Sequence, residues 1–393
     1  MKRNSTDSAG MSRREFMGVA SGSMGALALG LAPRMSLAAA AASEARTVTF
    51  FDTGSGANFV QWWQTYAVPK YKQDAGIEVK YTSIPSAEVL QRIKAWSPGQ
   101  GDVDVLLLQT DKFAQFATEG FLENLQPLSA LIPNMAKAEP PDSKEAAGAP
   151  VEGRGTPFFR YQYVMAVNTA EVKRPPVGIK ELFSRAAEWK GKISYIDPRS
   201  PISTAGRFVA SGFLRAFGCD FGLPGGQENA TWGPAWEKLI EFEKFGFQKH
   251  ANSGGEHFGQ FTQGDIVIGW QAFDFIEYTK KIGSLPPAVK TIFMEEGLPG
   301  GAAYLAIPKG LSEVRRQAAA RFINFATSDD VQVHMVTEMF EFPGTNIWEK
   351  LPKTAYQLMP TREVYQQRRL PDPPLAAIRH IADVWATKVG YGK

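Results

Sequence analysis

Cysteine and histidine, two residue types that often build metal sites, are nearly missing from this sequence. Cys219 is the only cysteine among 393 residues, so no disulfide can form within the chain and no cysteine-based metal site can be built. The chain has four histidines, which are too few and too scattered to predict a metal cluster. They are His250, His257, His334 and His380. We therefore expect no bound metal and no cofactor.

Catalytic signature motifs and nucleotide-binding loops are missing as well. The sequence contains no S-x-x-K, no H-E-x-x-H and no G-x-S-x-G. Gly54 and Gly56 form G-x-G, but neither a third glycine nor a Walker lysine follows them, which argues against a phosphate loop. These absences favour a binding protein, and an exported enzyme of unknown chemistry is the alternative.

Net charge is small once the first 42 residues are set aside. The formal charge of the whole chain is +3 at pH 7, and the first 42 residues carry more basic than acidic side chains. The rest of the chain holds equal numbers of the two. A chain near neutrality has no broad electrostatic attraction to nucleic acid or anionic lipid, so we expect neither as a partner.

The first 42 residues resemble a twin-arginine signal peptide. Ser12–Met17 reads S-R-R-E-F-M, and the weakly apolar stretch Gly18–Ala32 follows. The run Ala38–Ala42 supplies small residues for cleavage. Met17 and Gly18 depart from the usual Leu and Lys. A membrane anchor is the alternative. No cysteine stands near the cleavage region, so we expect a mature protein that is periplasmic and not lipidated.

Strands and helices alternate through residues 47–119. Strands are predicted at Thr47–Phe51, Ile77–Thr82 and Asp104–Leu108, and helices at Phe59–Lys72, Ser86–Ala95 and Lys112–Glu119. This order is typical of βαβ units around a parallel sheet. The carboxyl ends of such strands share one edge, so loops Asp52–Asn58 and Gln109–Asp111 should face the same crevice.

A second lobe is expected further along the chain. Pro157–Val167 predicts one long strand that passes into this lobe, and Lys192–Ile196 predicts another. The loop Asp197–Ser203 leads into a helix near Thr204–Arg207. Its free N–H groups and hydroxyls suit either a polar ligand or ordinary N-capping. The Pro-rich segments Glu349–Met359 and Arg369–Pro374 are expected to wrap the surface.

The stretch Phe258–Phe275 is the most informative of the chain. Asp265–Trp270 predicts a buried strand with β-branched residues at its centre and glycine near both ends. Polar and aromatic residues follow, including Asp274. Ligands gather beyond strand ends in open α/β sheets, so Trp270 is expected in a cleft wall. Packing in the core is the alternative.

Several segments together resemble the extracellular solute-binding proteins of bacterial ABC importers. They are V-T-F-F-D-T-G-S-G-A-N-F-V-Q-W-W, D-V-D-V-L-L-L-Q-T-D-K-F-A-Q-F-A-T-E-G-F-L-E-N-L, W-K-G-K-I-S-Y-I-D-P, F-T-Q-G-D-I-V-I-G-W and G-G-A-A-Y-L-A-I-P-K-G. Their order and spacing extend over nearly the full mature chain. Within this family, the spermidine/putrescine-type and thiamine-type proteins are the most similar.

The resemblance implies an α/β fold, a two-lobe clamshell in which helices flank a mostly parallel sheet in each lobe. Residues 1–42 would be the signal peptide, 43–158 with 271–307 the N-terminal lobe, and 159–270 with 308–393 the C-terminal lobe. Strands would cross between lobes near Pro157–Tyr161, Trp270–Gln271 and Ile307–Pro308. The implied partners are a small-molecule ligand and a membrane permease with its ATPase, and we expect a monomer.

Ligand contacts in the family lie at the strand ends found above. The candidates here are Asp52, Ser55, Gln109, Asp111, Arg160, Tyr161, Ser203, Thr204, Trp270, Asp274 and Tyr304. Family members that bind polyamines hold ammonium groups with carboxylates, which slightly favours an organic cation. Ala272 stands where these members have an acidic residue, and Arg160 with Arg199 would suit an anion. A TRAP-type importer subunit for a carboxylate is a further alternative.

Overall fold

The computed structural model describes residues 46–53, 55–96, 100–221 and 229–389. The expected signal peptide, residues 1–42, lies outside the described residues. Two sheets organise the chain, and each is the centre of one lobe.

The first lobe is built on a six-stranded sheet. In spatial order its strands are β13 (Phe342–Pro343), β6 (Thr156–Arg160), β12 (Ala302–Ala306), β3 (Val105–Gln109), β1 (Thr47–Asp52) and β2 (Glu78–Ser83). β1 runs parallel to β2 and β3, whereas β12 is antiparallel to β3 and β6. β3 reads V-L-L-L-Q and is buried up to its last residue, as suits a central strand covered on both faces.

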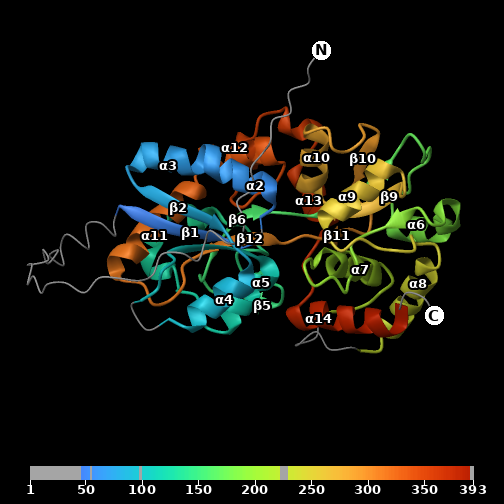
Figure 1. Ribbon diagram of the computed structural model, residues 1–393, viewed down its shortest axis with the longest axis horizontal. Helices are drawn as coiled ribbons and strands as arrows, with labels where there is room; N and C mark the ends of the chain where they lie inside the picture. Colours follow the sequence, from blue (N-terminus) through green and yellow to red (C-terminus); the bar gives the residue numbers. More distant parts are fainter. Residues whose placement is uncertain (1–45, 54, 97–99, 222–228, 390–393) are drawn as a thin grey trace, which may run out of the picture. The chain divides into compact units, whose positions relative to one another are not determined.

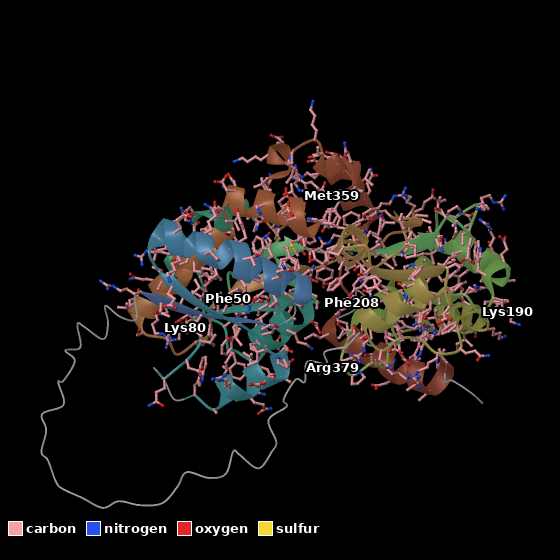
Figure 2. The ribbon with its side chains drawn as sticks, turned by 45° about the horizontal axis from the view of Figure 1, so that its top comes forward. Phe50, Lys80, Lys190, Phe208, Met359 and Arg379 are labelled. Carbon is pink, nitrogen blue, oxygen red and sulfur yellow. The ribbon has the colours of Figure 1, made fainter. Side chains whose placement is uncertain are left out.

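Helices cover both faces of this sheet, with α3 on one side and α4 on the other (Figure 1). The helices of this lobe are α2 (Ala57–Trp62), the π-helical turn η1 (Trp63–Ala67), α3 (Val68–Ala75), α4 (Ser86–Lys94), α5 (Thr110–Thr118), α11 (Glu313–Ala326) and α12 (Asp329–Met339). Phe50 of β1 packs against Trp63 and Phe322, with ring centroids 4.7 and 5.3 Å away (Figure 2). These aromatic contacts fix α11, from late in the chain, onto the first strand.

The second lobe is built on a four-stranded sheet. Its order is β10 (Val289–Ile292), β7 (Tyr163–Asn168), β9 (Ile268–Ala272) and β8 (Ile193–Ser194). β7 is antiparallel to β9 and β10, and β8 is parallel to β9. Around it lie α6 (Ile179–Arg185), α7 (Ala205–Ala216), α8 (Trp232–Glu243), α9 (Gly254–Gln263), α10 (Phe273–Lys281) and α14 (Leu375–Val384).

Short elements complete the chain. β11 (Leu298–Pro299) pairs in parallel with β14 (Arg369–Leu370), β4 (Glu145–Ala146) pairs with β5 (Ala149–Pro150), and α13 (Arg362–Arg368) precedes β14. The 3-10 helices are η2 (Gln126–Leu131), η3 (Pro133–Lys137), η4 (Ala186–Trp189), η5 (Trp348–Lys350) and η6 (Ala355–Gln357), and η7 (Trp385–Val389) is π-helical.

The chain passes between the lobes at three places: two adjacent ones, and a third between β13 of the first sheet and α14, which packs on α7 of the second lobe. The predicted long strand Pro157–Val167 is two strands, β6 and β7, which belong to different sheets and meet at Tyr161–Gln162. The return passage lies at Gly300–Gly301, between β11 and β12. The Tyr161 N–H donates to the Gly301 carbonyl over 3.0 Å, so the two passages are hydrogen-bonded to each other.

These passages correct the expected lobe boundaries. The sequence placed residues 271–307 in the first lobe, but β10 pairs with β7 in the second sheet. It placed 308–393 in the second lobe, but α11 packs on β1 and α12 on β13, whereas α14 does lie in the second lobe, packed on α7. The chain returns at Gly300–Gly301, and neither Trp270–Gln271 nor Ile307–Pro308 is a passage. Strands arriving from the other lobe enter antiparallel, so both sheets are mixed and not mostly parallel.

Candidate functional site

The loop between β1 and α2 is shaped by Asp52. This side chain is fully buried, where Oδ1 accepts the Ser55 N–H (3.0 Å) and Oδ2 accepts the Tyr81 hydroxyl (2.9 Å). The Ser55 hydroxyl of this loop and the Asn58 amide nitrogen in the first turn of α2 are buried and have no hydrogen-bond partner among the described residues. Asp52 therefore fixes the loop, while Ser55 and Asn58 keep unused hydrogen-bonding capacity.

This loop meets the first turn of α10, which belongs to the second lobe. A Cβ placed on Gly56 would lie 2.7 Å from ring atoms of Phe275, so the two segments are in close contact. Asp274 precedes Phe275 and is buried at the same place. Its carboxylate lies beside the amides of its own turn, but neither oxygen makes a regular hydrogen bond with a described residue other than Glu341.

Glu341 lies between α12 and β13, on the first lobe, and forms a buried carboxyl pair with Asp274. The Glu341 carboxyl donates a hydrogen bond to the Asp274 carboxylate. Burial raises the pKa of Asp274 to about 7, against the lowering effect of this hydrogen bond. Burial, and then the charge of Asp274, raise the pKa of Glu341 well above its usual range. Both shifts favour the protonated form of the pair.

Asp372 supplies a further buried carboxyl, beside the passages. Its Oδ2 accepts the Tyr161 hydroxyl over 2.9 Å, and its Oδ1 has no partner among the described residues. Burial raises the pKa of Asp372 to about 7, although the charge of Arg369 opposes this. A Cβ on Gly301 would lie only 1.9 Å from Oδ2, so any larger residue here would have to displace the Asp372 carboxyl. Asp372 lies in the segment Arg369–Pro374, which the sequence placed on the surface, and that expectation is wrong for this residue.

Asp111 and Gln109 lie at the carboxyl end of β3, as expected. Asp111 is buried in the first turn of α5, and its Oδ1 accepts the Lys112 N–H over 2.9 Å. Its Oδ2 is 3.1 Å from the Lys112 ammonium group. The neighbouring Thr110 side chain hydrogen-bonds Asp372. This strand end is therefore linked to the passages through Thr110.

Tyr163 begins β7 beside these carboxyls. Its ring stacks on Phe208 of α7, with centroids 5.7 Å apart (Figure 2), and lies 6.0 Å from that of Tyr161. Burial raises the pKa of Tyr163 well above its usual value, with a further rise from Asp372, Asp111 and Asp274. The charges of all three carboxyls therefore act on one hydroxyl, which lies beside the passages.

Buried polar atoms without partners gather in this region. Apart from the contact within the Asp274–Glu341 pair, the described residues include Ser55 Oγ, Asn58 Nδ2, Gln162 Oε1, Gln271 Nε2, both carboxylate oxygens of Asp274, Glu341 Oε2 and Asp372 Oδ1 among such atoms. They belong to both lobes and to the passages. Buried polar groups normally find partners, so such a concentration indicates a place for a polar ligand. The oxygen acceptors outnumber the two amide donors, which favours a ligand rich in N–H or O–H groups.

Trp270 lies away from this region. It is 1% exposed in β9, and its ring makes edge contacts with Phe213 (5.0 Å) and Tyr195 (6.0 Å). Alternate side chains of a strand face opposite ways, so Trp270 packs toward α7. The structure thus gives the core position that the sequence had left as the alternative to a cleft wall.

Arg160 and Tyr304 also have structural surroundings. The buried Arg160 donates to the Pro343 carbonyl (2.7 Å) and to Glu139 (3.2 Å). The Tyr304 hydroxyl donates to the Asp142 carbonyl (2.9 Å), and its ring stacks on Phe113. Both were expected to contact the ligand, but they pack inside the first lobe, because β6 and β12 are central strands of its sheet.

Ser203 and Thr204 form part of a self-contained loop before α7. Ser203 Oγ accepts the Ala205 N–H over 3.3 Å, and the Ser203 N–H donates to Ser200 Oγ. Arg199, offered above for an anionic ligand, forms an ion pair with Asp197 at 2.8 Å. These bonds tie the loop to itself, and Thr204, the N-cap residue of α7, makes no side-chain capping hydrogen bond.

Comparisons with known proteins identify the family. The family described as bacterial extracellular solute-binding protein matches residues 66–348. This chain belongs to that family. A search of curated protein sequences returned no match. The solute-binding resemblance expected from the sequence is confirmed.

Solved structures confirm the two-lobe fold of this solute-binding protein. The spermidine/putrescine ABC transporter substrate-binding protein PotD from Streptococcus pneumoniae is 15% identical, has a TM-score of 0.70, and is covered over 100% of its length by 88% of this chain. Maltose-bound MalE3 from T. maritima is 18% identical with a TM-score of 0.69, with coverage of 86% of this chain and 92% of that one. The Atu4243-GABA receptor is 19% identical with a TM-score of 0.66, covering 88% and 98%.

One cluster of this solute-binding protein resembles a hydrolytic triad. His250 Nε2 lies 2.9 Å from Glu243, and its Nδ1 lies 3.4 Å from the Ser194 hydroxyl. Nδ1 is closer to the Tyr195 carbonyl, at 3.1 Å, and a nitrogen that donates there cannot accept a proton from Ser194. All three side chains are buried inside the second lobe, so we interpret the cluster as part of the core of that lobe.

Two features are absent from the part of the chain that the structure describes. No group of three or more His, Cys, Asp or Glu side chains there is placed to hold a metal ion. Among the helices of the described ranges, none combines the length and the apolar character needed to cross a membrane.

Proposed function

We propose that this protein captures a small organic cation between its lobes and delivers it to an ABC permease with its cytoplasmic ATPase. The concentration of unpartnered buried acceptors from both lobes supports this proposal. Ammonium groups supply several N–H donors and a charge that carboxylates stabilise. Export by the twin-arginine route, a periplasmic location and a monomeric state complete the proposal.

Similar structures leave the ligand class open. Their names refer to spermidine and putrescine, to maltose and to GABA, which are chemically diverse. The preference for a cation therefore comes from this chain's own side chains. Asp274, Glu341 and Asp372 supply unpartnered carboxyl oxygens, whereas the nearby Arg207 already donates to the carbonyls of Pro198 and Ser200.

A thermal-shift screen of the mature protein tests the proposal. Carried ligand would first be removed by mild unfolding and refolding. The panel would hold polyamines, thiamine, amino acids, sugars, sugar phosphates and dicarboxylates. A ligand at a hundredfold excess over its Kd adds ~2.7 kcal/mol to stability, which raises the melting temperature measurably. We expect organic amines to give the response, and a response from anionic or neutral solutes alone would refute the cation class.

Matched variants connect the response to the site. Asp274→Asn removes one buried carboxylate and should weaken binding of the responding cation at least tenfold. Asp74→Asn is the control, because Asp74 is an exposed partner of Lys70 on α3. Equal affinities for the wild-type protein and Asp274→Asn would place the ligand elsewhere.

A further inference from the structure

The Asp274–Glu341 pair joins the two lobes directly. Asp274 begins α10, which packs on β7, β9 and β10 of the second sheet. Glu341 directly precedes β13, which pairs with β6 of the first sheet. The Phe273 and Phe342 rings that flank the pair stack with centroids 5.5 Å apart. A change in the charge of this pair therefore acts where the lobes meet.

Charge compensation for the pair is missing from its surroundings within the described residues. From α10 and α12, Lys281 and Glu338 face each other in an ion pair at 2.7 Å. From β7 comes the neutral hydroxyl of Tyr163. Arg160 of β6 lies beside Phe342 but is occupied by Glu139 and the Pro343 carbonyl. Two ionised carboxylates here would repel each other in a medium of low dielectric constant.

We propose that Asp274 and Glu341 share one proton in the ligand-free protein, and that an ammonium group of the ligand replaces it, releasing the proton to solvent. The Oδ atoms of Asp274 and Oε2 of Glu341 then accept N–H bonds from the ligand. This inference rests on the proposed function, because it requires a cationic ligand. It makes Glu341 a ligand-binding residue and makes capture depend on pH.

The pH dependence has a definite sign. Ligand binding favours the ionised pair, so the affinity should fall at acid pH, where a proton must first be removed. The loss approaches ~tenfold for each pH unit below the titration of the free pair. Above that titration the affinity should become independent of pH.

Infrared spectroscopy of the ligand-free protein tests the shared proton. A protonated carboxyl gives a carbonyl stretch separate from that of carboxylate. We expect the wild-type spectrum minus the Glu341→Gln spectrum at pH 6 to contain this band, because glutamine donates to Asp274 without a titratable proton. Glu338→Gln is the control and should leave the band unchanged. A difference spectrum without the band would overturn the inference, whatever ligand binds.

Calorimetry tests the exchange, with 1,4-diaminobutane as the probe in two buffers of different ionisation enthalpy. We expect release of close to one proton per amine bound at pH 6 for the wild type and Glu338→Gln, and close to none for Glu341→Gln. Asp274→Asn provides a second variant should Glu341→Gln fold poorly. Binding without proton release would overturn this inference alone. If the amine does not bind, the cation class of the proposed function fails and the exchange fails with it.

Discussion

Gly56→Ala should hinder the close approach of the lobes. The added Cβ would lie 2.7 Å from the Phe275 ring, whereas ordinary contacts begin at 3.4 Å. The β1–α2 loop and α10 must therefore separate by ~0.7 Å or repack, and such overpacking costs ~1–3 kcal/mol. We expect the lobes to separate in the ligand-free protein and to lose this contact, so the cost should fall on ligand binding. We expect an affinity loss of ~5- to 150-fold, the equivalent of that energy.

The assay compares binding with stability. Isothermal calorimetry would measure the Kd of the ligand found by the screen, and small-angle scattering the radius of gyration of the saturated protein. The control is Gly233→Ala in α8, because a Cβ there meets no atom within 4 Å. Gly56→Ala should weaken binding and leave a larger radius at saturation. Wild-type affinity in Gly56→Ala would refute the contact between the loop and α10.

Three further predictions concern stability. Trp270→Ala should lower the free energy of unfolding by ~3–5 kcal/mol in urea titrations, since the ring is core. Lost binding with unchanged stability would contradict this. Burial lowers the pKa of His257 from 6.5 to about 4. As the pH falls from 6.5 to 4, the unfolded state therefore takes up a proton before the folded state does, and the free energy of unfolding decreases by ~3 kcal/mol in total. Unfolding curves at pH 7 and pH 4 should show a smaller difference in His257→Gln. Arg160→Met should lower the free energy of unfolding by more than ~1 kcal/mol because it breaks a buried pair, whereas Arg154→Met, at a half-buried surface pair, should stay within ~0.5 kcal/mol. Equal effects of these two would refute the structural role of Arg160.

Local sequence patterns predicted the alternating first lobe well. β1, β2 and β3 lie within two residues of their predicted ranges, because each is an apolar or alternating run bounded by polar residues. The passages between lobes were harder to place. Pro157–Val167 reads as one strand, and nothing local shows that Tyr161–Gln162 leaves one sheet for another. Sheet membership depends on pairing between distant segments, which single-sequence patterns do not contain.

The candidate site shows the same division. Asp274 and Asp111 could be placed near strand ends from periodicity. Glu341 and Asp372 could not, because they lie in short irregular segments that only tertiary contacts bury. The one sequence feature connected with Asp372 is the glycine pair Gly300–Gly301 before β12, because the missing side chain of Gly301 leaves room for the Asp372 carboxyl. Trp270 was expected in the site but lies in the core, since an aromatic residue at the end of a predicted strand suits a cleft wall and a core equally.

The late return of the chain to both lobes affects how the protein can fold. β12 separates β3 from β6 in the first sheet, and β14 pairs with β11 only 23 residues before the last residue, Lys393. The second sheet has all its strands at Ile292, but the first sheet needs β13 at Phe342–Pro343, and the β11–β14 pair needs Leu370. Contacts of such large sequence separation form slowly. Folding therefore follows synthesis, and a truncated chain that lacks β14 and α14 leaves Tyr161 and Gly301 without the carboxyl that covers them.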